Sequence, residues 1–203
     1  MATIDMETVK ALRELTGTGV LDCKKALVAS DGNIDKAIDI LREKGLAKAV
    51  SKASREATDG MVFSYIHAGG NLGVLVQLNC ETDFVAKTDD FQNLGKEIAI
   101  QIAATDPSFI RPEDVPAEVV EHEKGLYRVQ LEAEKKPEQV WDKIVEGKLA
   151  AFYKENCLMH QPYIRDESKT VEELVKTMIA KTGENIVVAR FARFKIGGNP
   201  TVC

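Results

Sequence analysis

The chain has 203 residues, of which 44% are apolar and 29% are charged, and its formal net charge is −5. This composition is typical of a globular protein with a substantial core and excludes an extended disordered chain. No apolar run approaches the roughly 20 residues that cross a bilayer, and residues 1–7 lack the basic and apolar regions of a signal peptide, so we expect a cytoplasmic protein.

The charge is distributed unevenly along the chain. Residues 1–55 hold ten Lys and Arg against eight Asp and Glu, a balance of +2, whereas residues 56–203 hold 17 against 24, a balance of −7. Neither part has the basic excess with which a protein neutralises several phosphates. We therefore expect no direct binding of nucleic acid.

The four cysteines, Cys23, Cys80, Cys157 and Cys203, are widely separated. Zinc ligands and redox pairs need close spacing, which argues against both. The first three are predicted to be buried, reduced thiols. Cys203 follows Gly197–Pro200 and is predicted to be a free thiol on a flexible tail, able to oxidise to a second copy of the chain.

The first 55 residues have the apolar spacing of short packed helices. Glycines in the segment 16–19 predict the end of a first helix, the turn 30–33 separates a second helix from a third, and Gly45 is predicted to end the third. The basic segment 46–55 is predicted to be a helical linker, for which a solvated face is favoured over RNA contact. The predicted inward residues of this three-helix bundle are Met6, Val9, Leu12, Leu15, Cys23, Ala26, Leu27, Ile34, Ala37, Ile38 and Leu41.

From Gly60 onward the pattern predicts strands followed by helices and a last strand. This order indicates an α+β domain with an antiparallel sheet. The predicted elements are a hairpin of strands 61–67 and 72–78, a helix ended by Asp106-Pro107, helices over 116–135, 137–155 and 170–181, and a strand over 186–194. The predicted inward residues of these helices are Phe91, Leu94, Ile98, Ile102, Val140, Ile144, Phe152, Val171, Leu174, Val175 and Met178.

The segment 79–87, Asn-Cys-Glu-Thr-Asp-Phe-Val-Ala-Lys, follows the buried strand 74–78. It places Phe84 and Val85 among polar residues at the end of a strand, which favours insertion of an apolar tip into a partner. The alternative is that Phe84 folds back into the core, which is the commoner position for a loop phenylalanine.

Enzymatic motifs are weak in this sequence. Gly69–Gly73 faintly resembles a dinucleotide-binding loop, but a strand follows it where that loop needs a helix. Glu81 and Asp83 would point the same way in an extended segment, which permits an acid–base pair, although solvated polar flanks are favoured. With no P-loop and no clustered histidines, the sequence favours a binding protein that needs no cofactor and no metal.

The segment 82–87, Thr-Asp-Phe-Val-Ala-Lys, resembles the signature of the bacterial elongation factor Ts family. Residues 12–27, LRELTGTGVLDCKKAL, are similar to the N-terminal signature of that family. Further similarity lies in residues 109–115, 161–164 and 168–171. The resemblance therefore extends over nearly the whole chain, with the two signatures in the family's order.

The resemblance implies a ubiquitin-associated-like three-helix module with its linker over 1–55 and an α+β core and dimerisation domain over 56–203. It implies a protein that is not an enzyme but a guanine nucleotide exchange factor for elongation factor Tu, promoting GDP release so that GTP can rebind. Because the chain has one core copy where longer members have two, a homodimer is expected.

The resemblance also implies the residues of the partner interface. Phe84 would enter the GTPase domain and displace the elements that hold Mg²⁺, while Thr82 and Asp83 fix the loop and Val85 packs beneath it. Family members often have methionine where Val20 and Leu21 stand. His67 matches a family position near the interface, and a core or surface histidine without a role in binding is an equal alternative. The further contact residues implied are Arg13, Val20, Leu21, Lys24, His67 and Ile164.

Two other functions remain open at this point. The helical module could bind a peptide or a ubiquitin-like protein, with an unrelated enzyme behind it, but no nucleophile, base or metal set supports this. The chain could instead be a ribosome-associated RNA-binding protein, which the −7 balance of residues 56–203 disfavours.

Overall fold

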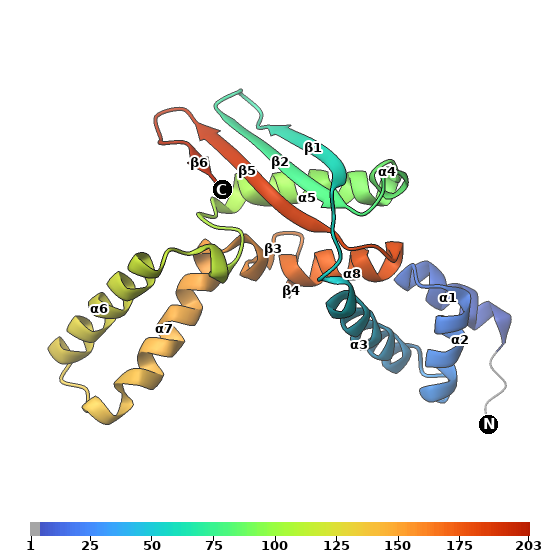
Figure 1. The fold of residues 1–203 in the computed structure, drawn as a ribbon. Coiled ribbons are helices and arrows are strands. Elements are labelled where there is room, and N and C mark those ends of the chain that lie inside the picture. Colours follow the sequence, from blue (N-terminus) through green and yellow to red (C-terminus); the bar gives the residue numbers. More distant parts are fainter. Residues whose placement is uncertain (1–4) are drawn as a thin grey trace. The chain divides into compact units, whose positions relative to one another are not determined.

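The computed structural model describes residues 5–203 (Figure 1). The first four residues, on which the prediction about a signal peptide partly rests, lie outside the described residues. The α-helices are α1 (Met6–Thr16), α2 (Val20–Ala29), α3 (Ile34–Lys52), α4 (Asp83–Ala86), α5 (Asp89–Thr105), α6 (Ala117–Ala133), α7 (Trp141–Asn156) and α8 (Val171–Thr182). The strands are β1 (Asp59–Ile66), β2 (Leu72–Cys80), β3 (Pro162–Tyr163), β4 (Asp166–Thr170), β5 (Val187–Lys195) and β6 (Thr201–Val202). Short 3₁₀ helices lie at Pro112–Asp114, Glu138–Val140 and Leu158–His160.

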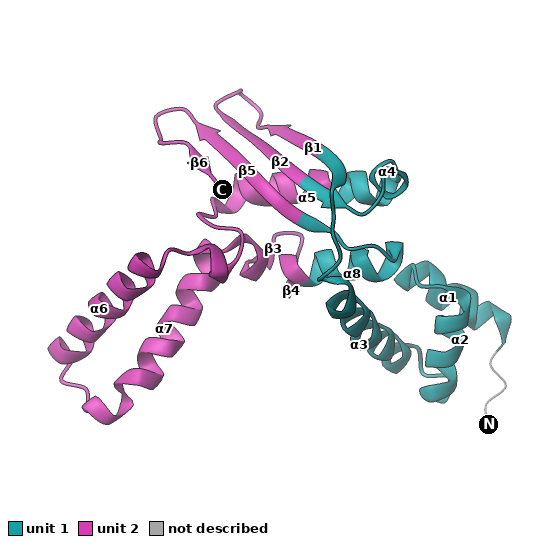
Figure 2. Ribbon diagram, viewed as in Figure 1, with its two compact units in different colours: residues 1–61, 78–94, 173–187 teal, residues 62–77, 95–172, 188–203 magenta. Residues whose placement is uncertain are grey.

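Over residues 5–203, four strands form one sheet in the order β1-β2-β5-β6, and β3 pairs with β4 in a separate antiparallel ribbon. Three N-terminal helices precede this antiparallel sheet and its helices, so the predicted α+β class is confirmed. The chain divides into two compact units, shown in Figure 2. The first unit contains residues 5–61, 78–94 and 173–187 of the described chain, and the second contains 62–77, 95–172 and 188–203. A domain boundary at residue 55 stays a prediction.

In the first unit, α1, α2 and α3 bury one another's apolar faces. The core of this bundle consists of Val9, Leu12, Cys23, Ala26, Leu27, Ala37 and Leu41, with Ile34, Ile38 and Ile40 packed against it. Met6 and Leu15 are exposed, so the predicted inward stripe of α1 is half wrong. Successive residues of a helix lie about 100° apart, so a three-residue spacing drifts by about 60° a step and takes the outer members of the stripe away from the core.

The third helix continues through Gly45 to Lys52, so the prediction that Gly45 ends it is wrong. A glycine inside a helix weakens it only modestly and does not stop it unless the chain turns there. A Cβ atom at Gly45 would lie 3.1 Å from the Cβ of Ala180 in α8. The glycine therefore permits a close approach of α3 to α8, and residues 46–52 continue α3 instead of forming a separate linker.

In the second unit, the predicted hairpin of β1 and β2 is confirmed, closed by a hydrogen bond of 2.9 Å from the His67 N–H to the Leu72 carbonyl. Helix α5 from Gly95 onward covers one face of the strands (Figure 1), and a Cβ at Gly95 would lie 2.2 Å from the Phe63 ring. All four residues predicted to face inward from α5 are buried. On α8, most of which belongs to the first unit, half of the predicted face is buried, namely Val171 and Val175, while Leu174 and Met178 are half-buried.

The C-terminal tail forms strand β6, so the prediction of a flexible tail is wrong. Gly197, at a φ of 80°, turns the chain back, and Val202 pairs antiparallel with Ala192 of β5. The Cys203 backbone exchanges two hydrogen bonds with Phe191, at 2.7 and 2.9 Å. Cys203 is a half-buried free thiol, and the prediction of buried free thiols at the other three cysteines is confirmed.

Helices α6 and α7 form an antiparallel hairpin in the second unit (Figure 2). Leu131 and Val145 are buried between them, and the Lys148 ammonium lies 5.4 Å from the centre of the Tyr127 ring. Val140 is exposed and precedes α7, against the prediction, because the chain after Pro137 first makes a 3₁₀ turn. No helix among the described residues is both long and apolar enough to span a membrane.

Candidate partner-binding site

The side chain of Phe84 projects from the short helix α4 and is 80% exposed. It follows the end of the buried strand β2, in the first unit, so the alternative that it folds back into the core is excluded. The segment is a helical turn and not extended, because the Thr82 hydroxyl caps it by accepting a hydrogen bond of 3.5 Å from the Val85 N–H. An aromatic ring in water on a capped turn is a candidate wedge.

The other residues of α4 fix its orientation. Ala86 is buried and Val85 is half-buried, so this side of the turn packs against the unit while Phe84 points away. On the exposed side, Asp83 forms an ion pair of 2.6 Å with Lys87, which lowers the pKa of the Asp83 carboxyl. The ion pair between Asp83 and Lys87 therefore links the start of the turn to the residue that follows it, while Phe84 projects outward.

Glu81 and Asp83 do not form an acid–base pair. One Glu81 oxygen accepts a hydrogen bond of 2.7 Å from the Asn185 N–H, and the other lies 3.5 Å from the Arg55 guanidinium. Asp83 is paired instead with Lys87. Because each carboxylate is occupied by its own donor, the site lacks the shared proton that acid–base chemistry by such a pair requires.

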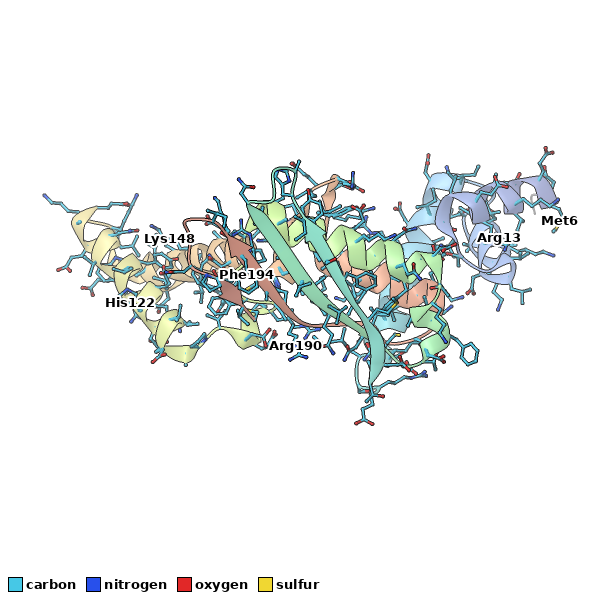
Figure 3. The ribbon with its side chains drawn as sticks, turned by 90° about the horizontal axis from the view of Figure 1, so that it is seen from above. Met6, Arg13, His122, Lys148, Arg190 and Phe194 are labelled. Carbon is cyan, nitrogen blue, oxygen red and sulfur yellow. The ribbon has the colours of Figure 1, made fainter. Side chains whose placement is uncertain are left out.

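The residues implied for the helical module are exposed on α1 and at the start of α2. Arg13 on α1 is exposed (Figure 3). Val20 and Leu21 begin α2 and are exposed, Leu21 by 75%, and Lys24 on the same helix is also exposed. Asp22 lies beside them and accepts hydrogen bonds of 2.6 and 2.8 Å from the lysines at 44 and 48 of α3. These two ammonium groups lower the pKa of Asp22 to about 2 and hold α2 against α3.

His67 and Ile164 lie in the second unit. The His67 ring is exposed, with Nδ1 2.9 Å from the Tyr65 hydroxyl oxygen, so a core position is excluded. Ile164 is 37% exposed, and its N–H donates a hydrogen bond of 3.0 Å to the Gln101 side chain. Both are accessible at the surface, and their contact with a partner stays a prediction.

Sequence reasoning missed two residues behind the wedge. Glu184 accepts two hydrogen bonds from Thr82, and Asn185 is 3% exposed and donates to Glu81 and to the Arg55 carbonyl, which follows α3. The sequence did contain an indication of these residues, because the polar pair Glu184-Asn185 lies between Gly183, which ends a helix, and the apolar start of the next strand. Polar residues at such a buried position must have partners, although the sequence does not say which.

An exposed aromatic ring on a braced turn and an exposed apolar pair on a helical module are features typical of a protein that binds another macromolecule. Among residues 5–203, no group of three His, Cys, Asp or Glu side chains could hold a metal ion.

The model of the elongation factor Ts family matches residues 8–198. The chain is 60% identical over 194 residues to elongation factor Ts of Caldanaerobacter subterraneus subsp. tengcongensis, covering 96% of this chain and 97% of that one. It is 52% identical over 197 residues to that of Desulfosudis oleivorans, covering 97% and 100%. The protein of Syntrophus aciditrophicus is 52% identical over 189 residues, covering 93% and 94%.

The chain belongs to the elongation factor Ts family. Members of this family are not enzymes but nucleotide exchange factors for elongation factor Tu in translation elongation. Because the match runs through both the helical module and the sheet, an unrelated enzyme behind the module is excluded.

Proposed function

We propose that this chain accelerates GDP release from elongation factor Tu by inserting Phe84 into the GTPase domain, where the ring displaces the elements that hold Mg²⁺ and the phosphates. The observation that carries the proposal is the 80% exposure of Phe84 on a turn that is capped, ion-paired and packed from behind. A rigid exposed ring loses little conformational entropy on insertion.

The energetic basis of exchange is reciprocal coupling. A GTPase holds GDP through phosphate-loop amides and through a Mg²⁺ ion that the nucleotide helps to coordinate. The factor by which the bound chain lowers the affinity of the GTPase for GDP is also the factor by which bound GDP lowers the affinity of the GTPase for the chain. A coupling free energy of about 4 kcal/mol would lower each of these two affinities by roughly a thousandfold. GTP then rebinds because it is the more abundant nucleotide.

The helical module would supply affinity, separately from the wedge. Val20 and Leu21 would pack on another face of the GTPase domain, with Arg13 and Lys24 at the rim. An exposed apolar pair flanked by charges matches the usual interface pattern of an apolar centre within a polar rim. Thr82, Asp83 and Val85 would hold the wedge, and His67 and Ile164 would make additional contacts.

Release of a fluorescent GDP analogue from elongation factor Tu tests the proposal directly. Rapid release with the chain at a small fraction of the GTPase concentration is the expected result, because an exchange factor turns over. Failure to accelerate release from a GTPase that another exchange factor does activate would contradict the proposal.

We also propose that two copies of the chain associate through the sheet of the second unit. The face opposite α5 carries exposed apolar residues, and they line an open hollow of about 490 Å³. A single face of this kind suits a two-fold symmetric contact, in which the same patch serves both copies. The residues concerned are Ile66, Leu75, Phe194 and Ile196.

Replacing Phe194 with aspartate should weaken this association at least tenfold, because two like charges would be buried at a symmetric contact. The ring is 56% exposed on β5 (Figure 3), so the fold of one copy should persist. Sedimentation equilibrium over a range of concentrations measures the effect, with Val129→Asp on α6 as an exposed control. A parent chain that stays monomeric throughout would contradict the proposed dimer.

A further inference from the structure

The polar groups of Thr82 are all engaged within the first unit. Its N–H and its hydroxyl donate to the two oxygens of Glu184, at 3.0 and 2.7 Å. Its carbonyl accepts from the Cys80 thiol at 3.1 Å, and its hydroxyl oxygen caps α4 through the Val85 N–H. One carboxylate therefore fixes both the backbone and the side chain of the residue that begins the wedge turn.

The Cys80 thiol adds to this arrangement as a lasting donor. Burial and the nearby Glu184 carboxylate raise the pKa of Cys80 to about 11, so the sulfur keeps its proton at neutral pH. The Thr82 carbonyl thus retains a donor, although thiols donate weakly. The stronger restraints on Thr82 are the two bonds to the carboxylate.

Glu184 is itself held in place. It follows Gly183, whose φ of 82° ends α8, and its N–H donates to the Thr182 hydroxyl at 3.3 Å. The next residue, Asn185, donates from its backbone to Glu81 at 2.7 Å and from its side chain to the Arg55 carbonyl at 2.7 Å. The carboxylate therefore projects from a backbone tied both to the residue before Thr82 and to the end of the helical module.

Helix α4 needs such support. It contains four residues, Asp83–Ala86, and a helix of one turn has no stability of its own in water. Phe84 is two residues from Thr82, so the direction of its ring depends on the cap. Loss of the cap would let the turn fray and the ring sample many directions.

We propose that Glu184 is a positioning residue for nucleotide exchange, whose carboxylate holds Thr82 and thereby keeps Phe84 aimed at the partner. The inference rests on the proposed function of Phe84 as the wedge. Glu184 acts from within the chain and needs no contact with the partner. Its removal should impair the exchange step and spare the affinity that the helical module provides.

The test compares Glu184→Gln with the matched variant Glu146→Gln, which changes an exposed glutamate on α7. An amide cannot accept both Thr82 bonds with its two ends, so the maximal rate of GDP release should fall about tenfold, as expected for loss of a hydrogen bond to a charged group. The half-saturating concentration should stay within about twofold of the parent, because the module surface is unchanged. Hydrogen exchange of the peptide covering residues 82–87 should accelerate, and Glu146→Gln should resemble the parent in all three measurements.

Thr82 offers a second route that does not alter Glu184. Thr82→Val keeps the shape without the hydroxyl and should lose activity as Glu184→Gln does, whereas Thr82→Ser keeps the hydroxyl and should lose less activity than Thr82→Val. The double variant Thr82→Val/Glu184→Gln should be little worse than either single variant, because both remove the same interaction.

Phe84→Ala, measured beside these variants, separates the two proposals. If Phe84→Ala is impaired while Glu184→Gln and Thr82→Val exchange at the parent rate, the positioning role is wrong and the wedge stands. If Phe84→Ala itself exchanges at the parent rate, the wedge is wrong. A loss of thermal stability in Glu184→Gln that changes rate and affinity in proportion would overturn the positioning role in favour of a purely structural one.

Discussion

Replacing Phe84 with alanine should lower the maximal rate of GDP release from elongation factor Tu by roughly 10- to 100-fold. Burying a phenylalanine side chain in a partner contributes about 1.5–3 kcal/mol, and each 1.4 kcal/mol corresponds to about a factor of ten. Because the ring is 80% exposed in the free chain, its removal should leave the melting temperature nearly unchanged. Stopped-flow fluorescence at saturating concentrations of the chain measures the rate, and thermal denaturation checks the fold.

Two further variants make this result specific to the wedge. Val129→Ala removes an exposed apolar side chain from α6 and should exchange GDP at the parent rate. Phe84→Leu retains apolar bulk and should recover part of the loss. A Phe84→Ala chain that is folded and as active as the parent would refute the assigned role of the ring.

Replacing both Val20 and Leu21 with alanine should raise the half-saturating concentration about tenfold or more without changing the maximal rate. The two side chains are exposed at the start of α2, so their truncation removes contact area from the partner and little from the module's core. Contacts that are equally strong before and during GDP release contribute to affinity alone, so their loss leaves the maximal rate at saturation unchanged. A titration of the exchange rate against the concentration of the chain gives both quantities.

Val28→Ala is the matched control for the module surface, since Val28 is an exposed valine on the same helix. It should behave like the parent if the contact is confined to the start of α2. Deletion of residues 1–55 would be a less specific test, because α3 approaches α8 at Gly45 and the Arg55 carbonyl holds Asn185. An unchanged half-saturating concentration in the Val20/Leu21 variant would remove this surface from the interface.

Periodic patterns in the sequence predicted the main elements well. The spacing of Phe91, Leu94, Ile98 and Ile102 identified the buried face of α5, and the glycines at 69 and 70 identified the hairpin turn. These features are local, since they depend on the helical or strand period and on backbone conformations that glycine favours.

The errors arose where contacts between separate elements decided the outcome. Gly45 was expected to end α3, but a close neighbour, Ala180, explains a glycine within the helix. Residues 201–203 were expected to be flexible, but they pair with β5, which lies just before them beyond a glycine turn. Ala180 is far from Gly45 in the sequence, and the spacing of apolar residues does not predict that β6 pairs with β5.

In the candidate site, too, some features follow from the sequence and others depend on contacts that the sequence does not reveal. Residue patterns alone left Phe84 between a core and a surface position, and the resemblance to the family favoured the surface. Its exposure in the structure settles that choice, whereas the brace by Glu184 had no counterpart in any motif, because Thr82 and Glu184 are 102 residues apart. The contacts with elongation factor Tu stay predictions.

The most direct measurement of the central claim is the rate of fluorescent GDP release with excess Mg²⁺ and again after its removal by EDTA, using the parent chain and Phe84→Ala. If Phe84 acts by displacing the elements that hold Mg²⁺, the parent should greatly outperform the variant in Mg²⁺. Without Mg²⁺ the release rates with the parent chain and with Phe84→Ala should differ by no more than roughly twofold, because there is then no bound Mg²⁺ for the ring to destabilise. An equal advantage of the parent in both conditions would contradict the claim.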